Sequence, residues 1–398
     1  MGHAGRRQLY VLSILTARRL PAAGGEEFAV LKRFLKILSV FLLPIVLLYG
    51  LFAGVLYSTR ELAGLDAVVN ATVQGDLVLY GTAHHENFAA YKLRVTQQLA
   101  PRLLVLGTSR SMQLRSEFFS EPSFYNAGGA VRTMADYEDF LRNLPQNALP
   151  DTLLVVLDQN MFNTTWRESS PTDPQTYGDL PNDSFATLLR TGFDYGNHKF
   201  SIVQNLLPRA GIYGLAAAAK GMGFAADGSY RYGTVALQNT DEPEKNFATT
   251  YRDIDFGELR FAPGTTPDEL ALAQLDSLLA FCSSAGIHVV GFLPPFPPAV
   301  NAKMQASGQY GYISGLYAAI APRFAAVGGE FYDFTQMQNT TDNEYIDGFH
   351  GGDRVYAKIT LALAQESTLL APLLAPATTE TLLNAPSESA RVLADHLS

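Results

Sequence analysis

Cysteine is almost absent from the sequence, and several other informative patterns are missing altogether. Cys282 is the only cysteine among 398 residues, so no intrachain disulfide can form. It stands in an apolar run, which predicts a buried structural thiol rather than a reactive one. No P-loop, HExxH or CxxC motif is present, and no group of potential ligands has a recognisable metal-binding spacing. We therefore expect neither a cofactor nor a metal.

Positive charge is also scarce. The chain has 29 lysines and arginines against 38 aspartates and glutamates, a net charge of −9. Nucleic-acid binding depends on a basic surface, so this balance argues against a nucleic-acid partner. Hydrophobic residues make up 47% of the chain, enough for a sizeable core, and the length allows one large domain with accessories or two domains.

One long apolar segment, residues 37–59, carries no charge over about 23 residues and is long enough to span a bilayer. The basic residues that precede it are Arg6, Arg7, Arg18, Arg19, Lys32, Arg33 and Lys36. By the positive-inside rule, residues 1–36 are a cytoplasmic lead, and everything after the segment lies outside the cytoplasm. A cleaved signal peptide is the alternative, but its apolar region is normally about 7–15 residues long, and no clear A-x-A site follows. We expect an uncleaved anchor in the inner membrane, with a periplasmic or extracytoplasmic domain.

Short apolar runs alternate with amphipathic patterns farther along the chain. The runs are residues 103–106, 124–125, 153–157, 288–293 and 331–332, and helical spacing covers 86–99, 134–144, 267–285 and 314–324. This alternation predicts an α/β domain with a parallel sheet over residues 101–370, with functional residues at the carboxyl ends of the strands. Residues 60–100 are expected to form a juxtamembrane stalk and helix, and residues 371–398 a flexible tail.

Residues 163–263 interrupt the alternation. This piece is rich in Asn, Asp, Thr, Gly and Tyr, with an Ala-rich helix candidate at 212–223. We interpret it as an insertion after the third strand, either a lid or substrate-binding region or a mere decoration. Its stretches GFDYGNH and DGSYRYG could stack on and hydrogen-bond sugars, or could be surface loops.

The first apolar run leads directly into Gly-Thr-Ser-Arg-Ser. Ser109 follows Gly107 by two residues, and the small glycine permits a sharp turn that exposes a hydroxyl. The alternative is an ordinary polar turn. We expect Ser111 to sit in the first turn of a helix and Arg110 to lie on the surface, where it could also add positive potential near an anionic substrate.

The last apolar run is followed by EYIDGFHGGDRVY. Asp347 and His350 are three residues apart on a glycine-rich loop, so a carboxylate can hold one imidazole nitrogen and leave the other for a serine. The alternative is a polar loop in which Asp347 caps a helix. The other six histidines lack a comparable setting.

Two further strand ends offer hydrogen-bond donors. FYNAGGA places Gly128 and Gly129 after the second strand, where backbone N–H groups can approach a ligand closely. LLVVLDQNMFN places Asn160, with its side-chain amide, just after the third strand, and Asn163 is a rival for the same role. Each could equally be part of an ordinary turn.

Taken together, the order Ser, Gly-Gly, Asn and Asp-x-x-His resembles the SGNH (GDSL-like) hydrolase superfamily over residues 101–370. The resemblance implies a three-layer flavodoxin-like fold. It also implies Ser109 as nucleophile, His350 as base, Asp347 as its partner, and Gly128 or Gly129 with Asn160 and the Ser109 N–H as the oxyanion hole. Two motifs depart from the superfamily pattern: G-T-S replaces G-D-S, and D-Q-N replaces G-x-N-D.

The GTSRS block, the membrane anchor, the strand ending in LPPFPP and the closing D-G-x-H are similar to envelope-anchored bacterial SGNH proteins. These are the proteins that O-acetylate alginate and related exopolysaccharides, and the one that helps D-alanylate teichoic acids. The resemblance implies acyl transfer to a cell-surface polysaccharide, in partnership with a membrane-bound O-acyltransferase. An extracytoplasmic esterase or deacetylase with the same residues remains open, as does a non-catalytic scaffold of an export or modification complex.

Overall fold

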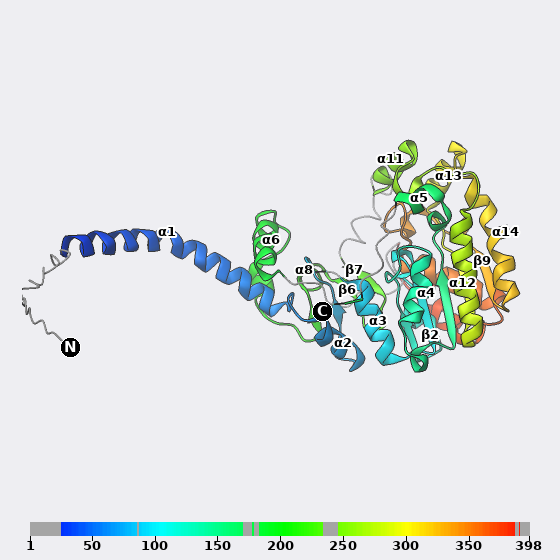
Figure 1. Cartoon of the computed structure of the whole chain (residues 1–398), viewed down its shortest axis with the longest axis horizontal. Helices are drawn as coiled ribbons and strands as arrows, with labels where there is room; N and C mark the ends of the chain where they lie inside the picture. The colour runs from blue at the N-terminus through cyan, green and yellow to red at the C-terminus, as the bar shows by residue number, and fades with distance from the viewer. Residues whose placement is uncertain are drawn as a thin grey trace, which may run out of the picture. The chain divides into compact units, whose positions relative to one another are not determined.

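The computed structural model describes residues 25–85, 87–169, 177–178, 183–233, 246–386 and 390. The chain divides into two compact units, Met1–Leu51 and Phe52–Ser398. In the first unit the described residues belong to helix α1 (Gly25–Ser58), whose last turns are part of the second unit (Figure 1). The helical segment Glu27–Ser58 is long and apolar enough to cross a membrane, and few of its residues are buried. This agrees with the apolar segment expected at 37–59.

Five parallel strands form the central sheet of the second unit. They are β2 (Leu103–Gly107), β3 (Phe124–Asn126), β4 (Thr152–Val156), β8 (His288–Leu293) and β9 (Glu330–Asp333), in the spatial order β3-β2-β4-β8-β9. Each coincides with one of the predicted apolar runs to within two residues at either end. The prediction of an α/β domain with a parallel sheet is therefore confirmed.

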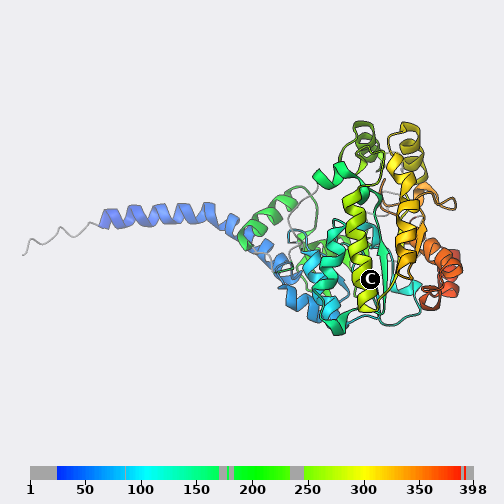
Figure 2. The same ribbon diagram turned by 45° about the vertical axis from the view of Figure 1, so that its right-hand side comes forward.

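Side chains alternate between the two faces of this sheet along each strand, and both sets are apolar. Both faces must therefore be covered, and helices cover them. Leu104 and Leu106 of β2 belong to one core, and Leu103 and Val105 to the other. The first core is completed by α2 (Leu65–Val73), α3 (Phe88–Leu99), α4 (Ala135–Arg142), α12 (Glu269–Ala285) and α14 (Gly311–Ala326). The second is completed by α11 (Ala248–Phe256), α13 (Pro298–Ser307) and α15 (Asp353–Glu366) (Figures 1 and 2).

The helix expected at 86–99 within residues 60–100 is present as α3, but a second, smaller sheet corrects the expectation of a stalk before it. It consists of β1 (Leu79–Tyr80), β5 (Ile212–Tyr213), β6 (Met222–Phe224) and β7 (Tyr230–Tyr232), in the order β5-β1-β6-β7. The segment before β1 is equally well packed, since Val69 of α2 is fully buried. The chain after α1 is thus folded into the domain, because its short apolar stretches pair with the insertion.

The insertion has a shorter Ala-rich helix than expected. Of the Ala-rich stretch 212–223, only α8 (Leu215–Lys220) is helical, because β5 and β6 take up its two ends. The other α-helices among the described residues of this part are α5 (Thr164–Ser169), α6 (Ser184–Gly196), α7 (Ile202–Asn205) and α11. Residues 170–176, 179–182 and 234–245, which include part of the expected lid, lie outside the described residues.

The expected flexible tail contains a packed helix. Helix α16 (Pro376–Asn384) contacts α15, and Thr379 is buried. The backbone N–H of Ala375 donates to the carbonyl of Phe118, which ties the start of this helix to the domain. Residues 387–389 and 391–398 lie outside the described part of the chain.

Candidate active site

Strand β2 ends in a tight turn that presents Ser109. Thr108 precedes the single-turn 3₁₀ helix Ser109–Ser111, and its hydroxyl accepts the backbone N–H of Arg110 at 3.2 Å. A side chain at Gly107 would lie within 2.9 Å of the Ser111 side chain, so only glycine lets the turn close this tightly. Ser111 lies in this first helical turn, as expected, with its hydroxyl donating to the carbonyl of Thr108.

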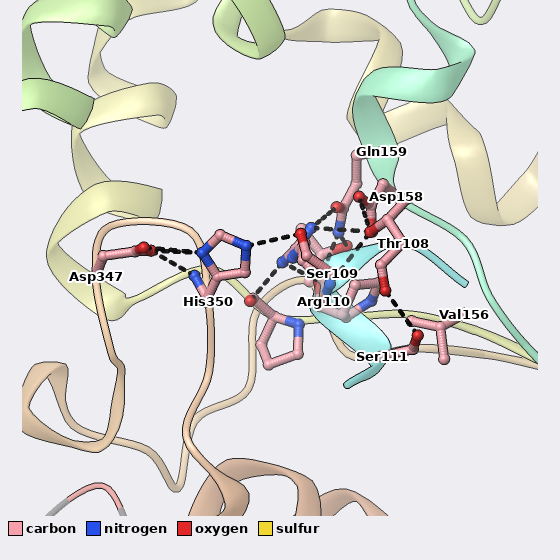
Figure 3. A network of polar contacts seen from close by, with 12 residues as sticks. Thr108, Ser109, Arg110, Ser111, Val156, Asp158, Gln159, Asp347 and His350 are labelled. Atoms are coloured by element: carbon pink, nitrogen blue, oxygen red, sulfur yellow. Dashed lines mark hydrogen bonds and ion pairs between the residues drawn. The ribbon is translucent and has the colours of Figure 1, made fainter. Parts of the chain in front are cut away.

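Ser109, His350 and Asp347 lie in a single hydrogen-bonded line (Figure 3). The Oγ of Ser109 is 2.8 Å from Nε2 of His350, although 241 residues separate them in sequence. On the other side of the ring, Nδ1 of His350 is 2.8 and 3.0 Å from the two carboxylate oxygens of Asp347. The structure therefore brings together the three residues that the sequence singled out.

The electrostatics of Asp347 fix the protonation of the imidazole. Burial acts to raise the pKa of Asp347, but the charge of His350 and hydrogen bonds from His350 and the backbone outweigh it and lower the pKa to about 2. An ionised carboxylate can only accept hydrogen bonds, so Nδ1 of His350 carries a proton. In the neutral ring, Nε2 is then the acceptor for the Ser109 hydroxyl.

The loop that carries His350 is held from both ends. Asp347 accepts the backbone N–H groups of Phe349 and His350 at 2.8 and 2.7 Å, and the N–H of Ile346 donates to the carbonyl of His350 at 2.8 Å. The ring of Phe349 is contacted by two guanidinium groups, those of Arg110 at 4.4 Å and Arg260 at 4.3 Å from the ring centroid. Each is a cation–π arrangement.

Arg110 is buried, which corrects the expectation of a surface position. Its side chain is 0% exposed, and burial lowers its pKa while Asp158 acts in the opposite sense. The guanidinium donates to Oε1 of Gln159 at 2.6 Å and to the carbonyls of Pro294 and Pro295 at 3.0 and 2.6 Å. Arg110 thus links the carboxyl ends of β2, β4 and β8 beneath Ser109.

The two departures from the superfamily motifs lie side by side in this network. Thr108, which stands where G-D-S would have aspartate, donates its hydroxyl to Oδ2 of Asp158 at 2.7 Å. Asp158 is buried and opens the D-Q-N stretch, whose Gln159 holds Arg110. A threonine–aspartate pair across β2 and β4 therefore anchors the turn that carries the serine (Figure 3).

The two glycines do not offer free N–H groups to a ligand. The N–H of Gly128 donates to Oδ1 of Asn126 at 2.7 Å, and that of Gly129 to the carbonyls of Gly107 and Thr108 at 2.9 and 3.1 Å. Their lack of side chains has a steric reason instead. A Cβ at Gly128 would lie 2.5 Å from Oγ of Ser111, and Gly129 has φ +85° with the end of Met112 within 2.2 Å of its would-be Cβ.

Asn160 and Asn163 have different surroundings. Both are buried, and Asn163 is fully used in the structure: its amide donates to the carbonyls of Ala262 and Pro263, and its oxygen caps the N–H of Trp166. Asn160 lines the cavity beside Ser109, and within the described residues neither its amide nitrogen, the donor, nor its buried oxygen, an acceptor, has a hydrogen-bond partner. The Ser109 N–H also has no acceptor there. These two groups, rather than the glycines, are available to a ligand.

A cavity of about 290 Å³ opens at Ser109. Its lining is Phe88, Thr108, Ser109, Met112, Gly129, Val131, Arg132, Asp158, Asn160, Trp166, Arg260 and Phe349. Trp166 and Arg260 come from the two ends of the insertion, so that segment contributes to the walls of the site. Sequence reasoning did not single out Arg132, Trp166 or Arg260, because isolated arginines and tryptophans in irregular stretches carry no positional signal.

Comparisons of the chain with protein-family models, with curated protein sequences and with solved structures gave no significant match.

Proposed function

We propose that the chain is a serine acyl-transfer enzyme of the SGNH superfamily. The observation that carries the proposal is the unbroken line Ser109–His350–Asp347, with hydrogen-bond distances of 2.8 Å at both junctions. The strand order β3-β2-β4-β8-β9 adds support, because counted along the chain it is 2-1-3-4-5, the order of flavodoxin-like sheets. Ser109 lies at the end of β2, beside the point where that order reverses.

The first half-reaction follows from the protonation states of the site. The Ser109 hydroxyl gives its proton to Nε2 of His350 while Oγ attacks the carbonyl carbon of the acyl donor. Asp347 stabilises the resulting imidazolium. The negative charge on the former carbonyl oxygen is stabilised by the Ser109 N–H and the Asn160 side-chain amide. When the tetrahedral intermediate collapses, the leaving group takes the proton from His350 and an acyl-serine remains.

The second half-reaction transfers the acyl group to a hydroxyl. His350 takes the proton of the acceptor, whose oxygen attacks the acyl-serine, and Ser109 leaves with that proton restored. We propose a sugar hydroxyl of a cell-surface or exported polysaccharide as acceptor, and an acetyl group as the acyl unit. The cavity is lined by Trp166, whose ring is of the kind that stacks on sugars, and by two arginines, Arg132 and Arg260, whose positive charge attracts polar or anionic groups.

The proposed location is the inner membrane, with a single pass through α1 and the catalytic unit outside the cytoplasm. The length and composition of α1 support the span, and the lysines and arginines on its N-terminal side support the orientation. An enzyme there lacks direct access to cytoplasmic acyl donors. We therefore include a membrane-bound O-acyltransferase that delivers the acyl group as a partner in the proposal.

The nucleophile is tested with purified full-length protein and a small activated ester, p-nitrophenyl acetate. We expect Ser109→Ala to abolish acyl release and labelling by a fluorophosphonate. Ser111→Ala is the matched control, because it removes a hydroxyl two residues away that only bonds the Thr108 carbonyl. Equal turnover in Ser109→Ala and the unmodified chain would refute the assignment.

Transfer is separated from hydrolysis by offering an acyl donor together with neutral and anionic oligosaccharides. Mass spectrometry of the products distinguishes the two reactions. Acylated sugar supports the proposed transferase, whereas free acid alone supports an esterase with the same three residues. Substitution of Ser109 should abolish either product.

A further inference from the structure

Helix α6 carries an apolar stripe on its exposed side. Phe185, Leu189 and Phe193 are 69%, 44% and 70% exposed. Their spacing of four residues places them along one face of the helix. The residues that α6 buries are the hydroxyl-bearing Thr187 and Thr191. The helix therefore turns aromatic rings outward and polar side chains inward, the reverse of a helix whose outer face meets water.

This helix packs against the last turns of α1, within the second unit. The ring of Phe52 lies against Gly192, where a Cβ would be only 3.0 Å away, and its centroid is 5.6 Å from that of Tyr195. The following helix is attached to the same turns, because the hydroxyl of Ser58 donates to the carbonyl of Asn205 in α7. Helices α6 and α7 are thus held beside residues 52–58.

The level of these turns along a membrane span follows from the length of the apolar segment. A hydrocarbon core of about 30 Å takes about 20 helical residues. Counted from Ile37, where the charge-free run begins, these residues reach Leu56. Phe52 then lies near the outer edge of the hydrocarbon, and α6 lies at the same level. Val203 and Leu207, next along the chain, are also 80% and 77% exposed.

We propose that the α6 stripe, defined as Phe185, Leu189 and Phe193, lies in the outer interface of the bilayer among lipid acyl chains. The inference rests on the membrane-anchored arrangement given under Proposed function. It gives the catalytic unit a second attachment to the bilayer beside α1. Interfacial helices bind in this way, with the apolar face in the boundary region and the polar face toward water or protein. Such an attachment restricts rotation of the unit about α1.

The test uses the full chain in lipid nanodiscs that contain no other protein. Single cysteines are introduced as Phe185→Cys and Phe193→Cys in a Cys282→Ser background and labelled with an environment-sensitive fluorophore. Phe256→Cys is the matched control, because Phe256 is a 72% exposed phenylalanine on α11. We expect doxyl-labelled lipids to quench the two α6 labels severalfold more than the control. An aqueous quencher should show the opposite order.

Equal accessibility of the α6 and α11 labels to the aqueous quencher would overturn the proposal, and so would failure of the chain to enter nanodiscs. Protection of the α6 labels in native membranes but not in lipid-only nanodiscs would assign the stripe to a membrane protein instead of lipid, and would also overturn it. Fluorophosphonate labelling of Ser109 in the same samples reports the proposed catalytic function separately. Exposed α6 labels with an active serine would refute only the lipid contact.

Discussion

Replacing Arg110 by methionine should damage both stability and reactivity. The guanidinium is fully buried and donates three hydrogen bonds, to Gln159, Pro294 and Pro295. Methionine keeps apolar contact with the neighbouring rings but supplies no donor. It also leaves Asp158 buried, with the Thr108 hydroxyl as its side-chain donor among the described residues. Removing one member of a buried charged network costs about 3–5 kcal/mol, so we expect a loss of that order in the free energy of unfolding.

The assay is urea unfolding of the full chain in detergent, followed by far-UV circular dichroism. Arg102→Met is the control, because Arg102 forms an exposed ion pair with Asp151 at 2.7 Å and its loss should leave the unfolding midpoint unchanged. A shift in Arg110→Met no larger than in this control would refute the reasoning, since it would mean that the buried hydrogen bonds contribute nothing net.

The same substitution should slow the chemistry through His350. Arg110 contacts Phe349, the residue before His350, so its loss frees the loop that aligns the imidazole with Ser109. A displacement of about 1 Å can cost about 100-fold in rate. We expect a drop of that order in the rate at which a fluorophosphonate labels Ser109, measured without urea on folded protein. Arg110→Lys should not restore the rate, because an ammonium cannot reproduce the planar set of donors.

Four further predictions concern the rest of the site. Asp347→Asn should lower the rate of Ser109 labelling by about 10⁴-fold at neutral pH, because the imidazole loses its fixed tautomer and its counter-charge. Since the pKa of Asp347 is lowered to about 2, its ionised form stabilises the fold above the unfolded pKa near 4. That contribution to the free energy of unfolding should disappear as pH falls through about 2. The stability of Asp347→Asn should not show this part of the pH dependence. Asn160→Ala should reduce turnover by about 10²–10³-fold with little change in the unfolding midpoint. Asn163→Ala should instead lower the free energy of unfolding by about 1–2 kcal/mol. If Asn163→Ala lost turnover and Asn160→Ala lost stability, the two roles would be exchanged. Gly128→Ala should lower the thermal unfolding temperature, because its Cβ would meet Ser111; an unchanged temperature would show that the turn relaxes freely.

The sheet and the line of three residues could be predicted because each has a strong local signal. Buried parallel strands appear in sequence as continuous apolar runs, and the side chains at their carboxyl ends meet at one edge of the sheet. This edge is where Ser109 and Asn160 lie. Asp347 and His350 are so close in sequence that their contact needs only a tight loop.

Features that depend on distant pairing could not be predicted. The two-residue strand β1 gains its strand character only from β5 and β6, more than 130 residues later. The burial of Arg110 depends on acceptors from β4 and β8, and a charged residue alone is expected at the surface. The N–H groups of Gly128 and Gly129 are consumed by acceptors that glycine pairs do not reveal in sequence. The roles of the site residues in catalysis stay predictions.

The separation of 241 residues between Ser109 and His350 has a consequence for the order in which the chain is made. Synthesis delivers the serine turn long before the loop that carries the imidazole, and β9 must be added first. A nascent chain, or one truncated before residue 344, has a Ser109 hydroxyl without the His350 acceptor. If Ser109 acts as proposed, its reactivity reports that translation has passed β9 and that the serine turn and the His350 loop have met.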